Sequence, residues 1–303
     1  MANQPTITSN YAGEFAGKYI SAAVLSANTI ANNGVTVIPN VKFKSTLKKA
    51  VISGLVTDAT CDFTDTGVVT LSDKVLTVAE KQVNLQLCKT PFESDWEAVS
   101  MGYSAFDNMP STFSDFFIAK MLKDIALDTE NFLWNATTGL GKLLKTDGAT
   151  VIGTPLSITS ANVIAEMGRV VDGIPAALYG TEDLRIYVSQ NVAKAYVRAL
   201  GGFSVAATSN AGVNAQGTTW YNGGELTFDG VTVFVANGLP ANTMVAAQIS
   251  NLYAGFGLLD DQNLVKTIDM ADIDGSKNVR FIARFTRGLQ VGIGADSVTY
   301  GIA

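Results

Sequence analysis

The chain has 303 residues, of which 47% are apolar and 16% charged, with 27 acidic against 21 basic side chains and a formal net charge of −6. This length predicts about two domains, and the low charge fits either extensive surface buried between subunits or a compact β-rich protein covered by polar loops. The acidic balance argues against a nucleic-acid-binding surface, which would carry a stripe of lysine and arginine. The acidic balance remains compatible with a protein that encloses nucleic acid without binding it tightly.

The chain contains no histidine, which removes Ser-His-Asp and Cys-His catalysis and nearly all catalytic zinc sites. No phosphate-binding, dinucleotide or calcium motif is intact, so we expect no enzyme activity, no metal site and no cofactor. Cys61 and Cys88 form no C-x-x-C pair, and we expect free thiols packed as small hydrophobes in a reducing compartment, with pairing across a hairpin as the alternative.

The first ten residues do not resemble a signal peptide, and no stretch approaches the ~20 apolar residues of a membrane span, so we expect a protein made and kept in a cytosol.

The first third of the chain is predicted to be an arm followed by strands. Residues 13–30 have helical spacing but a weak apolar face, so this segment is expected to need a partner to fold against. From residue 35 apolar residues alternate across Pro39, and residues 51–87 hold several pieces rich in Thr, Val and Leu between turn residues. Their hydrophobicity is thin, which favours a long β-hairpin lying on another surface, since an isolated hairpin is only marginally stable in water.

A local basic cluster lies within this arm, formed by Lys42, Lys44, Lys48 and Lys49. Two interpretations of the cluster are open. The lysines form a solvated strand face, or they make an electrostatic contact with an acidic neighbour.

The longest helical pattern in the chain runs from Pro110 to Gly139. Apolar residues three, four or seven positions apart line one face of it, and they are Phe113, Phe117, Met121, Ile125, Phe132 and Leu133. At 1.5 Å per residue the helix is a rod on the order of 35 Å long, enough to cross a whole domain.

The middle of the chain has the texture of an α/β unit. A helix capped by Ser160 and ending at Gly173 is followed by a buried strand at 184–189 and a helix at 191–200. The stretch 202–224 is rich in Gly, Ser and Asn and is expected to be a mobile loop.

The last part of the chain is predicted to consist mainly of strands. Asp229-Gly230 predicts a two-residue type I′ turn between two strands. In the strong strand at 279–285, apolar residues alternate with Arg280 and Arg284, so the two arginines are expected on the face opposite to the core.

The order of these elements resembles that of the major capsid proteins of tailed bacteriophages, which have the HK97-like fold. That order is a polar arm, a long hairpin, a long helix, an α/β insert and a final strand with arginines. The resemblance covers nearly the whole chain, and four segments carry it: TSNYAGEFAGKYISAA, LRIYVSQNVAKAYVRAL, FDGVTVFVANGLPANTMVAAQISNLYAGFG and NVRFIARFTRGLQVGI.

The resemblance implies an α+β fold with a definite division of the chain. The hairpin, called the E-loop in this family, would lie over a neighbouring subunit. The implied parts are an N-arm at 1–34, the E-loop at 35–90, a peripheral domain at 91–155 with its spine helix at 112–136, an α/β axial domain at 156–263, and peripheral return strands at 264–303.

The resemblance also implies a structural, non-enzymatic role. The chain would self-assemble as pentamers and hexamers into an icosahedral phage head around double-stranded DNA, without sequence-specific binding and without a membrane. It would be assembled in the host cytoplasm and reside in the virion. A separate scaffolding protein and a portal are expected as partners, with room for decoration proteins. An encapsulin-like nanocompartment shell around cargo enzymes is the alternative.

The candidate contacts between subunits are Lys42, Lys44, Lys48, Lys49, Arg280 and Arg284.

Overall fold

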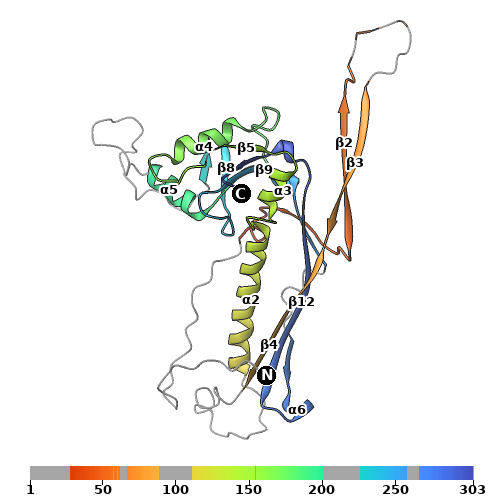
Figure 1. The fold of residues 1–303 in the computed structure, drawn as a ribbon, viewed down its shortest axis with the longest axis vertical. Helices are drawn as coiled ribbons and strands as arrows, with labels where there is room; N and C mark the ends of the chain where they lie inside the picture. Colours follow the sequence, from red (N-terminus) through yellow and green to blue (C-terminus); the bar gives the residue numbers. More distant parts are fainter. Residues whose placement is uncertain are drawn as a thin grey trace.

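The computed structural model describes residues 28–56, 58–59, 61, 67–88, 111–153, 155–200, 226–257 and 266–302. The expected helix at 13–30, up to residue 27, and the expected loop at 202–224 lie outside these ranges. The molecule is long, with a projecting hairpin at one end and a helix and sheet that extend to the other (Figure 1). Within the described ranges, no helix is both long enough and apolar enough to span a bilayer.

The strand β12 (Asn278–Val291) is the central element of a five-stranded sheet. It pairs antiparallel with β4 (Ala79–Cys88) along its first ten residues, with β11 (Lys266–Asp269) near its start and with β10 (Leu252–Phe256) at its end. The short β1 (Thr36–Ile38) adds to β10 in parallel. Burial alternates along β12, with the even-numbered Arg280 and Arg284 outward, so the predicted alternation is confirmed.

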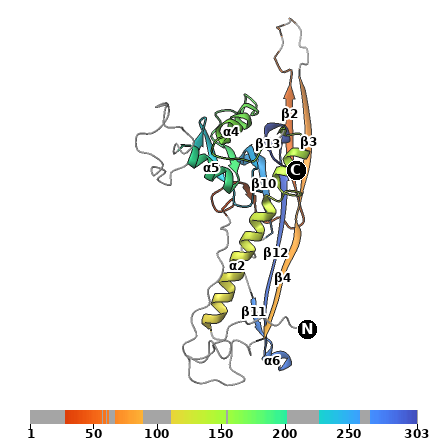
Figure 2. The same ribbon diagram turned by 60° about the vertical axis from the view of Figure 1, so that its left-hand side comes forward.

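The long helix α2 (Ser111–Leu133) packs on the apolar face of this sheet. Met121 lies against Val279 and Phe281, and Ile125 lies against Ala283 and Phe285. This packing follows from periodicity, because every third or fourth helical residue meets every second strand residue. Figure 2 shows α2 running beside β4 and β12.

A second, six-stranded sheet has the order β5-β13-β9-β6-β8-β7. Its strands are β5 (Thr150–Ile152), β6 (Leu184–Val188), β7 (Leu226–Phe228), β8 (Val231–Val235), β9 (Met244–Gln248) and β13 (Val298–Tyr300). The helices α4 (Val163–Asp172) and α5 (Gln190–Leu200) share one core with it, while α3 (Leu140–Thr146) and the end of α2 belong to a second core. The α/β texture predicted for the middle of the chain is therefore confirmed.

Two local predictions can be compared directly with this sheet. Asp229 and Gly230 have φ angles of 46° and 79°, and they join β7 to β8 as a two-residue turn, which confirms the type I′ prediction. The predicted Ser160 cap is wrong. The amide oxygen of Asn162 instead accepts the Thr159 N–H at 2.7 Å, the Val163 N–H donates to the Thr159 carbonyl at 3.0 Å, and the helix begins at Val163.

The chain passes between the two sheets more than once. The 3-10 helix η3 (Ile249–Asn251) leads from β9 into β10, and η5 (Gly294–Asp296) leads from the end of β12 towards β13. The final strand β13 therefore lies in the six-stranded sheet and not beside β12. Such repeated crossings tie the two sheets together covalently.

The third unit is the hairpin of β2 (Lys44–Ser53) and β3 (Val68–Thr77). Ten antiparallel pairs run from Lys44↔Thr77 to Ser53↔Val68. β3 continues through Val78 into β4, so one strand of the hairpin is an extension of the five-stranded sheet. Figures 1 and 2 both show the hairpin projecting beyond the rest of the molecule.

Candidate assembly surface

The hairpin carries apolar side chains that no other part of the described chain covers. In the β2–β3 register, Ile52 lies opposite Val69, Ala50 opposite Leu71, and Thr46 opposite Val75, so all six lie on one face, and the charged pair Lys48 and Asp73 lies among them. Four of them, which we call the apolar strip, are largely exposed: Ile52 54%, Val69 58%, Leu71 77% and Val75 43%. An apolar face of this kind on a thin two-stranded ribbon is typical of an interaction surface.

The root of the hairpin, by contrast, is firmly packed. Leu76 has 0% of its surface exposed and forms a small core with Val41 and Val78. It lies directly on Gly255, where any Cβ atom would overlap the Leu76 side chain. The side-chain amide of Gln290 donates to the Val75 carbonyl at 2.9 Å. The hairpin therefore leaves the body in a defined direction.

An ion pair adds a second attachment at the root. Lys74 Nζ lies 2.5 Å from Asp147 Oδ2 and donates to the Val291 carbonyl at 3.2 Å. Asp147 follows α3, and its carboxylate also accepts the Gly294 N–H at 2.6 Å. Asp147 therefore joins the hairpin, the end of α3 and the start of η5.

The four lysines of the basic cluster lie along the start of the hairpin. Lys42, Lys44 and Lys48 are exposed, and Lys49 is half-buried. Lys44 Nζ lies 5.3 Å from the ring centre of Phe43, which is itself exposed. In the part of the chain that the structure describes, none of the four lysines has an ion-pair partner.

The two candidate arginines lie elsewhere, on the outward face of β12. Arg280 Nε donates to Gln86 Oε1 of β4 at 2.7 Å, and Arg284 lies opposite Gln82. The structure therefore separates the candidate contacts into a lysine group on the hairpin and an arginine pair on the long sheet.

Of the residues expected in the core of the long helix, Met121 and Ile125 are buried. Phe132 is half-buried beneath Arg287, whose guanidinium carbon lies 4.3 Å from the ring centre. The side chains of Phe113 and Phe117 lie outside the described part.

Arg287 itself was not identified from the sequence. It is buried, forms a 2.6 Å ion pair with Asp128 and contacts Thr129, so it joins β12 to α2. The alternation of β12 could have identified Arg287, because odd-numbered residues of this strand face the core. A buried arginine requires an acidic or hydrogen-bonding partner.

A further cluster joins α2 to the six-stranded sheet. Glu130, which is buried, accepts hydrogen bonds from the backbone N–H of Thr29 at 3.1 Å and from its hydroxyl at 2.5 Å. Trp134 Nε1 donates to the same hydroxyl at 2.9 Å, and its ring packs 5.0 Å from Tyr187. Tyr187 donates to the Gly34 carbonyl at 2.5 Å, and burial raises the pKa of its phenol.

The remaining chemically reactive side chains of the described residues are the cysteines and the acidic residues. Among them, no group of three or more Cys, Asp or Glu side chains could hold a metal ion. Cys61 is exposed, so the expectation that it packs as a small hydrophobe is wrong, and no disulfide joins it to Cys88.

Comparison with known proteins gives no match to a family model and none to a curated protein. Solved structures do match. The capsid of a native GTA particle has a TM-score of 0.60 at 12% identity, covering 94% of this chain and 93% of that chain. The capsid of the cyanophage P-SCSP1u has a TM-score of 0.59 at 12% identity, covering 94% and 91%. The capsid of the Myoviridae phage XM1 has a TM-score of 0.58 at 14% identity, covering 93% and 94%. This chain therefore has the α+β, HK97-like fold of phage capsid proteins, as the resemblance implied.

Proposed function

We propose that this chain is a structural major capsid protein that self-assembles, as pentamers and hexamers, into the icosahedral head of a phage. The single observation that carries the proposal is the projecting β2–β3 hairpin with its apolar strip, in a chain that has a capsid fold along nearly its whole length. The hairpin has the shape of an arm that reaches a neighbour, and its exposed side chains have the chemistry of an interface.

The energetics favour a second copy as the partner of the strip. Fully burying one Val, Leu or Ile side chain stabilises an interface by about 1.5–3 kcal/mol before the costs of association. The strip holds four such side chains, all now largely in water. A chain that carries this much exposed apolar surface on a ribbon is expected to associate.

The parts of the fold take roles in this proposal. The hairpin lies in the E-loop at 35–90, α2 is the spine helix, and the six-stranded sheet forms most of the axial domain at 156–263. The five-stranded sheet belongs to the peripheral domain, with residues 264–303 returning to it and β13 crossing to the axial sheet. Residues 1–34 form the N-arm, and Thr29, near its end, is held by Glu130 and Trp134.

The particle would enclose double-stranded DNA, be assembled in the host cytoplasm and reside in the virion. It would assemble with a separate scaffolding protein and a portal, with room for decoration proteins. The names of the three matching structures, two phage capsids and the capsid of a GTA particle, support a phage head over an encapsulin-like compartment.

The test is to express the chain alone and with candidate scaffolding proteins, and to examine the products by size-exclusion chromatography and negative-stain electron microscopy. Closed shells, or rings of five and six subunits, are expected. Nuclease-protected DNA in native particles would distinguish the phage head from a cargo compartment. A protein that stays a monomer or dimer with every scaffold candidate would contradict the proposal.

A further inference from the structure

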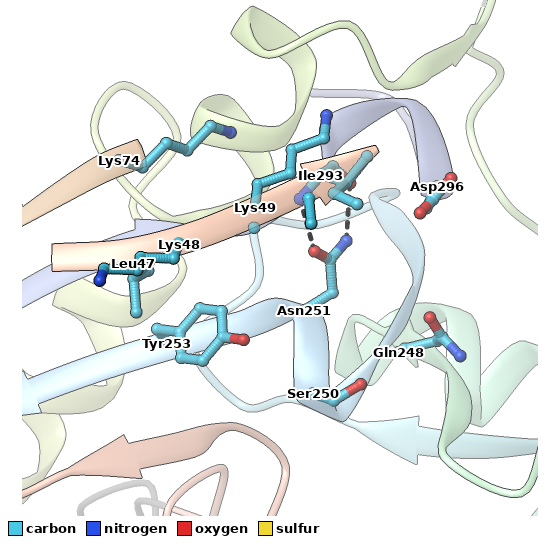
Figure 3. A pocket seen from close by; sticks show the side chains of 12 residues that line it. Leu47, Lys48, Lys49, Lys74, Gln248, Ser250, Asn251, Tyr253, Ile293 and Asp296 are labelled. Atoms are coloured by element: carbon cyan, nitrogen blue, oxygen red, sulfur yellow. Dashed lines mark hydrogen bonds between the residues drawn. The ribbon is translucent and has the colours of Figure 1, made fainter. Parts of the chain in front are cut away.

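A hollow lies under the root of the hairpin, between β2 and the residues around η3 and η5 (Figure 3). Its volume is about 280 Å³, slightly below the range of small-molecule pockets. Leu47, Tyr253 and Ile293 contribute its apolar lining, and its charged lining consists of Lys48, Lys49, Lys74 and Asp296. The size and lining fit one or two inserted side chains better than a cofactor.

Lys49 is the more buried of the two lysines in this hollow that lack an ion-pair partner among the described residues. It is half-buried, and within the described ranges it has no ion-pair partner, whereas the nearby Lys74 is neutralised by Asp147. The amide of Asn251 is already used, since it donates to the Ile293 carbonyl at 2.7 Å and accepts the Ile293 N–H at 2.6 Å. The hollow therefore presents two lysines without an ion-pair partner, Lys48 and Lys49, and one carboxylate, Asp296, beside an apolar lining.

A protruding feature of matching chemistry lies at the far end of the molecule. The short helix α6 (Ala271–Asp274) carries Ile273, which is 67% exposed. Outside the hairpin segment 43–75, no other apolar side chain of the described residues is as exposed. Asp274 follows it, and its carboxylate accepts the Ser276 N–H at 2.9 Å. Gly275, with a φ of 71°, makes the tight turn that presents both side chains.

The two features cannot meet within one chain. α6 precedes the first residue of β12, and the hollow is lined by residues that directly follow its last, Gly292 and Ile293. The 14 residues of β12 span about 45 Å at 3.3 Å each. Figure 1 shows α6 at the end of the long sheet opposite to the hairpin. The occupant must come from another molecule.

We propose that the α6 turn of one copy inserts into the hollow of a second copy, with Ile273 on the apolar lining and Asp274 against Lys49. A contact between two different surfaces of the same chain is heterologous, and repetition of such a contact builds a ring when the rotation between copies closes. The inference rests on the proposed self-assembly and names one of its contacts. Charge complementarity selects α6, because the turn offers a carboxylate directly beside an exposed apolar side chain.

The first test is a cysteine crosslink between copies. In a background with Cys61→Ser and Cys88→Ser, one protein carries Lys49→Cys and a second carries Ile273→Cys, and the two are mixed under assembly conditions with mild oxidation. A disulfide-linked heterodimer is expected on a non-reducing gel. The matched control is Lys44→Cys, because Lys44 is exposed on β2 and does not line the hollow. Equal crosslinking of both cysteines would overturn the inference.

The second test is a charge exchange. Lys49→Glu and Asp274→Lys, each alone, should weaken assembly roughly tenfold, and the double variant should restore it. Lys123→Glu, at an exposed lysine of α2 that does not line the hollow, should leave assembly near the wild-type level. If single variants assemble normally and no selective crosslink forms, the α6 contact is wrong and the capsid function stands. If the wild-type chain forms no particles and no crosslink, the function itself fails, and this contact fails with it.

Discussion

Lys74 and Asp147 lie 73 residues apart in sequence and form a 2.5 Å ion pair at the root of the projecting hairpin. Their side chains are 25% and 32% exposed, so water screens the pair only in part. Because Asp147 also accepts the Gly294 N–H, its carboxylate is held in place when Lys74 approaches. The pair is one of several contacts that hold the root of the hairpin on the body.

Removing this carboxylate charge should loosen the hairpin. We expect Asp147→Asn to lower the free energy of unfolding by about 1 kcal/mol and to speed hydrogen exchange in β2 and β3 selectively. Native-state exchange followed by mass spectrometry would measure this. The matched control is Asp124→Asn, which breaks the more exposed Lys120–Asp124 pair on α2 and should cost no more than about 0.5 kcal/mol. Unchanged exchange in the hairpin of Asp147→Asn would show that the pair does not hold it.

A charge on the apolar strip should block assembly and leave the fold intact. Leu71→Asp places a carboxylate where an apolar side chain is 77% exposed, so the free chain loses little. In an interface, the lost burial of about 1.5–3 kcal/mol corresponds to a roughly tenfold or larger loss of association. Chromatography would measure the assembled fraction, and circular dichroism the fold. Thr70→Asp, the neighbouring residue on the opposite face, is the control, and an equal loss for both variants would contradict the role of the strip.

The buried side chain of Leu76, which packs on Gly255, should contribute much more to the free energy of unfolding than the exposed leucine of the hairpin, Leu71. Leu76→Ala leaves a cavity at a fully buried position, and we expect a loss of about 2–4 kcal/mol in the free energy of unfolding. Leu71→Ala, from an exposed position, should change it by less than about 0.5 kcal/mol. Urea denaturation of both variants provides the comparison. Similar values for both would mean that the root is not packed as described.

Tyr187 should make the protein sensitive to alkaline pH. Burial raises the pKa of Tyr187 in the folded state above its ordinary value of 10, so the folded chain keeps the phenol proton after the unfolded chain has lost it. Stability is therefore fully present below pH 10 and falls above it, by about 1.4 kcal/mol per pH unit for this one group. Urea denaturation at pH 9, 10 and 11 would measure the slope.

Tyr187→Phe should reduce that slope, at a cost of about 1–2 kcal/mol at neutral pH because the Gly34 carbonyl loses its donor. Burial also raises the pKa values of Tyr196 and Tyr300, so part of the slope will remain. Tyr179→Phe, at an exposed tyrosine, is the control. A wild-type slope in Tyr187→Phe would contradict the role of this phenol.

The sequence by itself determined the elements whose signals are local. The long helix is specified by apolar residues at helical spacing, β12 by strict alternation, and the β7–β8 turn by Asp229-Gly230, because in each case neighbouring residues dictate the backbone. The local signal at Ser160 gave a wrong prediction, because Thr159 and Asn162 form the side-chain hydrogen bond at the start of this helix.

Only the tertiary structure decided which side chains meet across the chain. Leu76 packs on Gly255, Asp147 pairs with Lys74, and Glu130 binds Thr29, and each of these pairs joins elements far apart in sequence. Periodicity shows which face of an element is apolar, but it does not show which partner covers that face. Periodicity also did not show that the apolar strip and Lys49 lack a partner within the described chain. Their residue types were visible in the sequence, whereas their exposure follows from a hairpin that leaves the body and buries only its root.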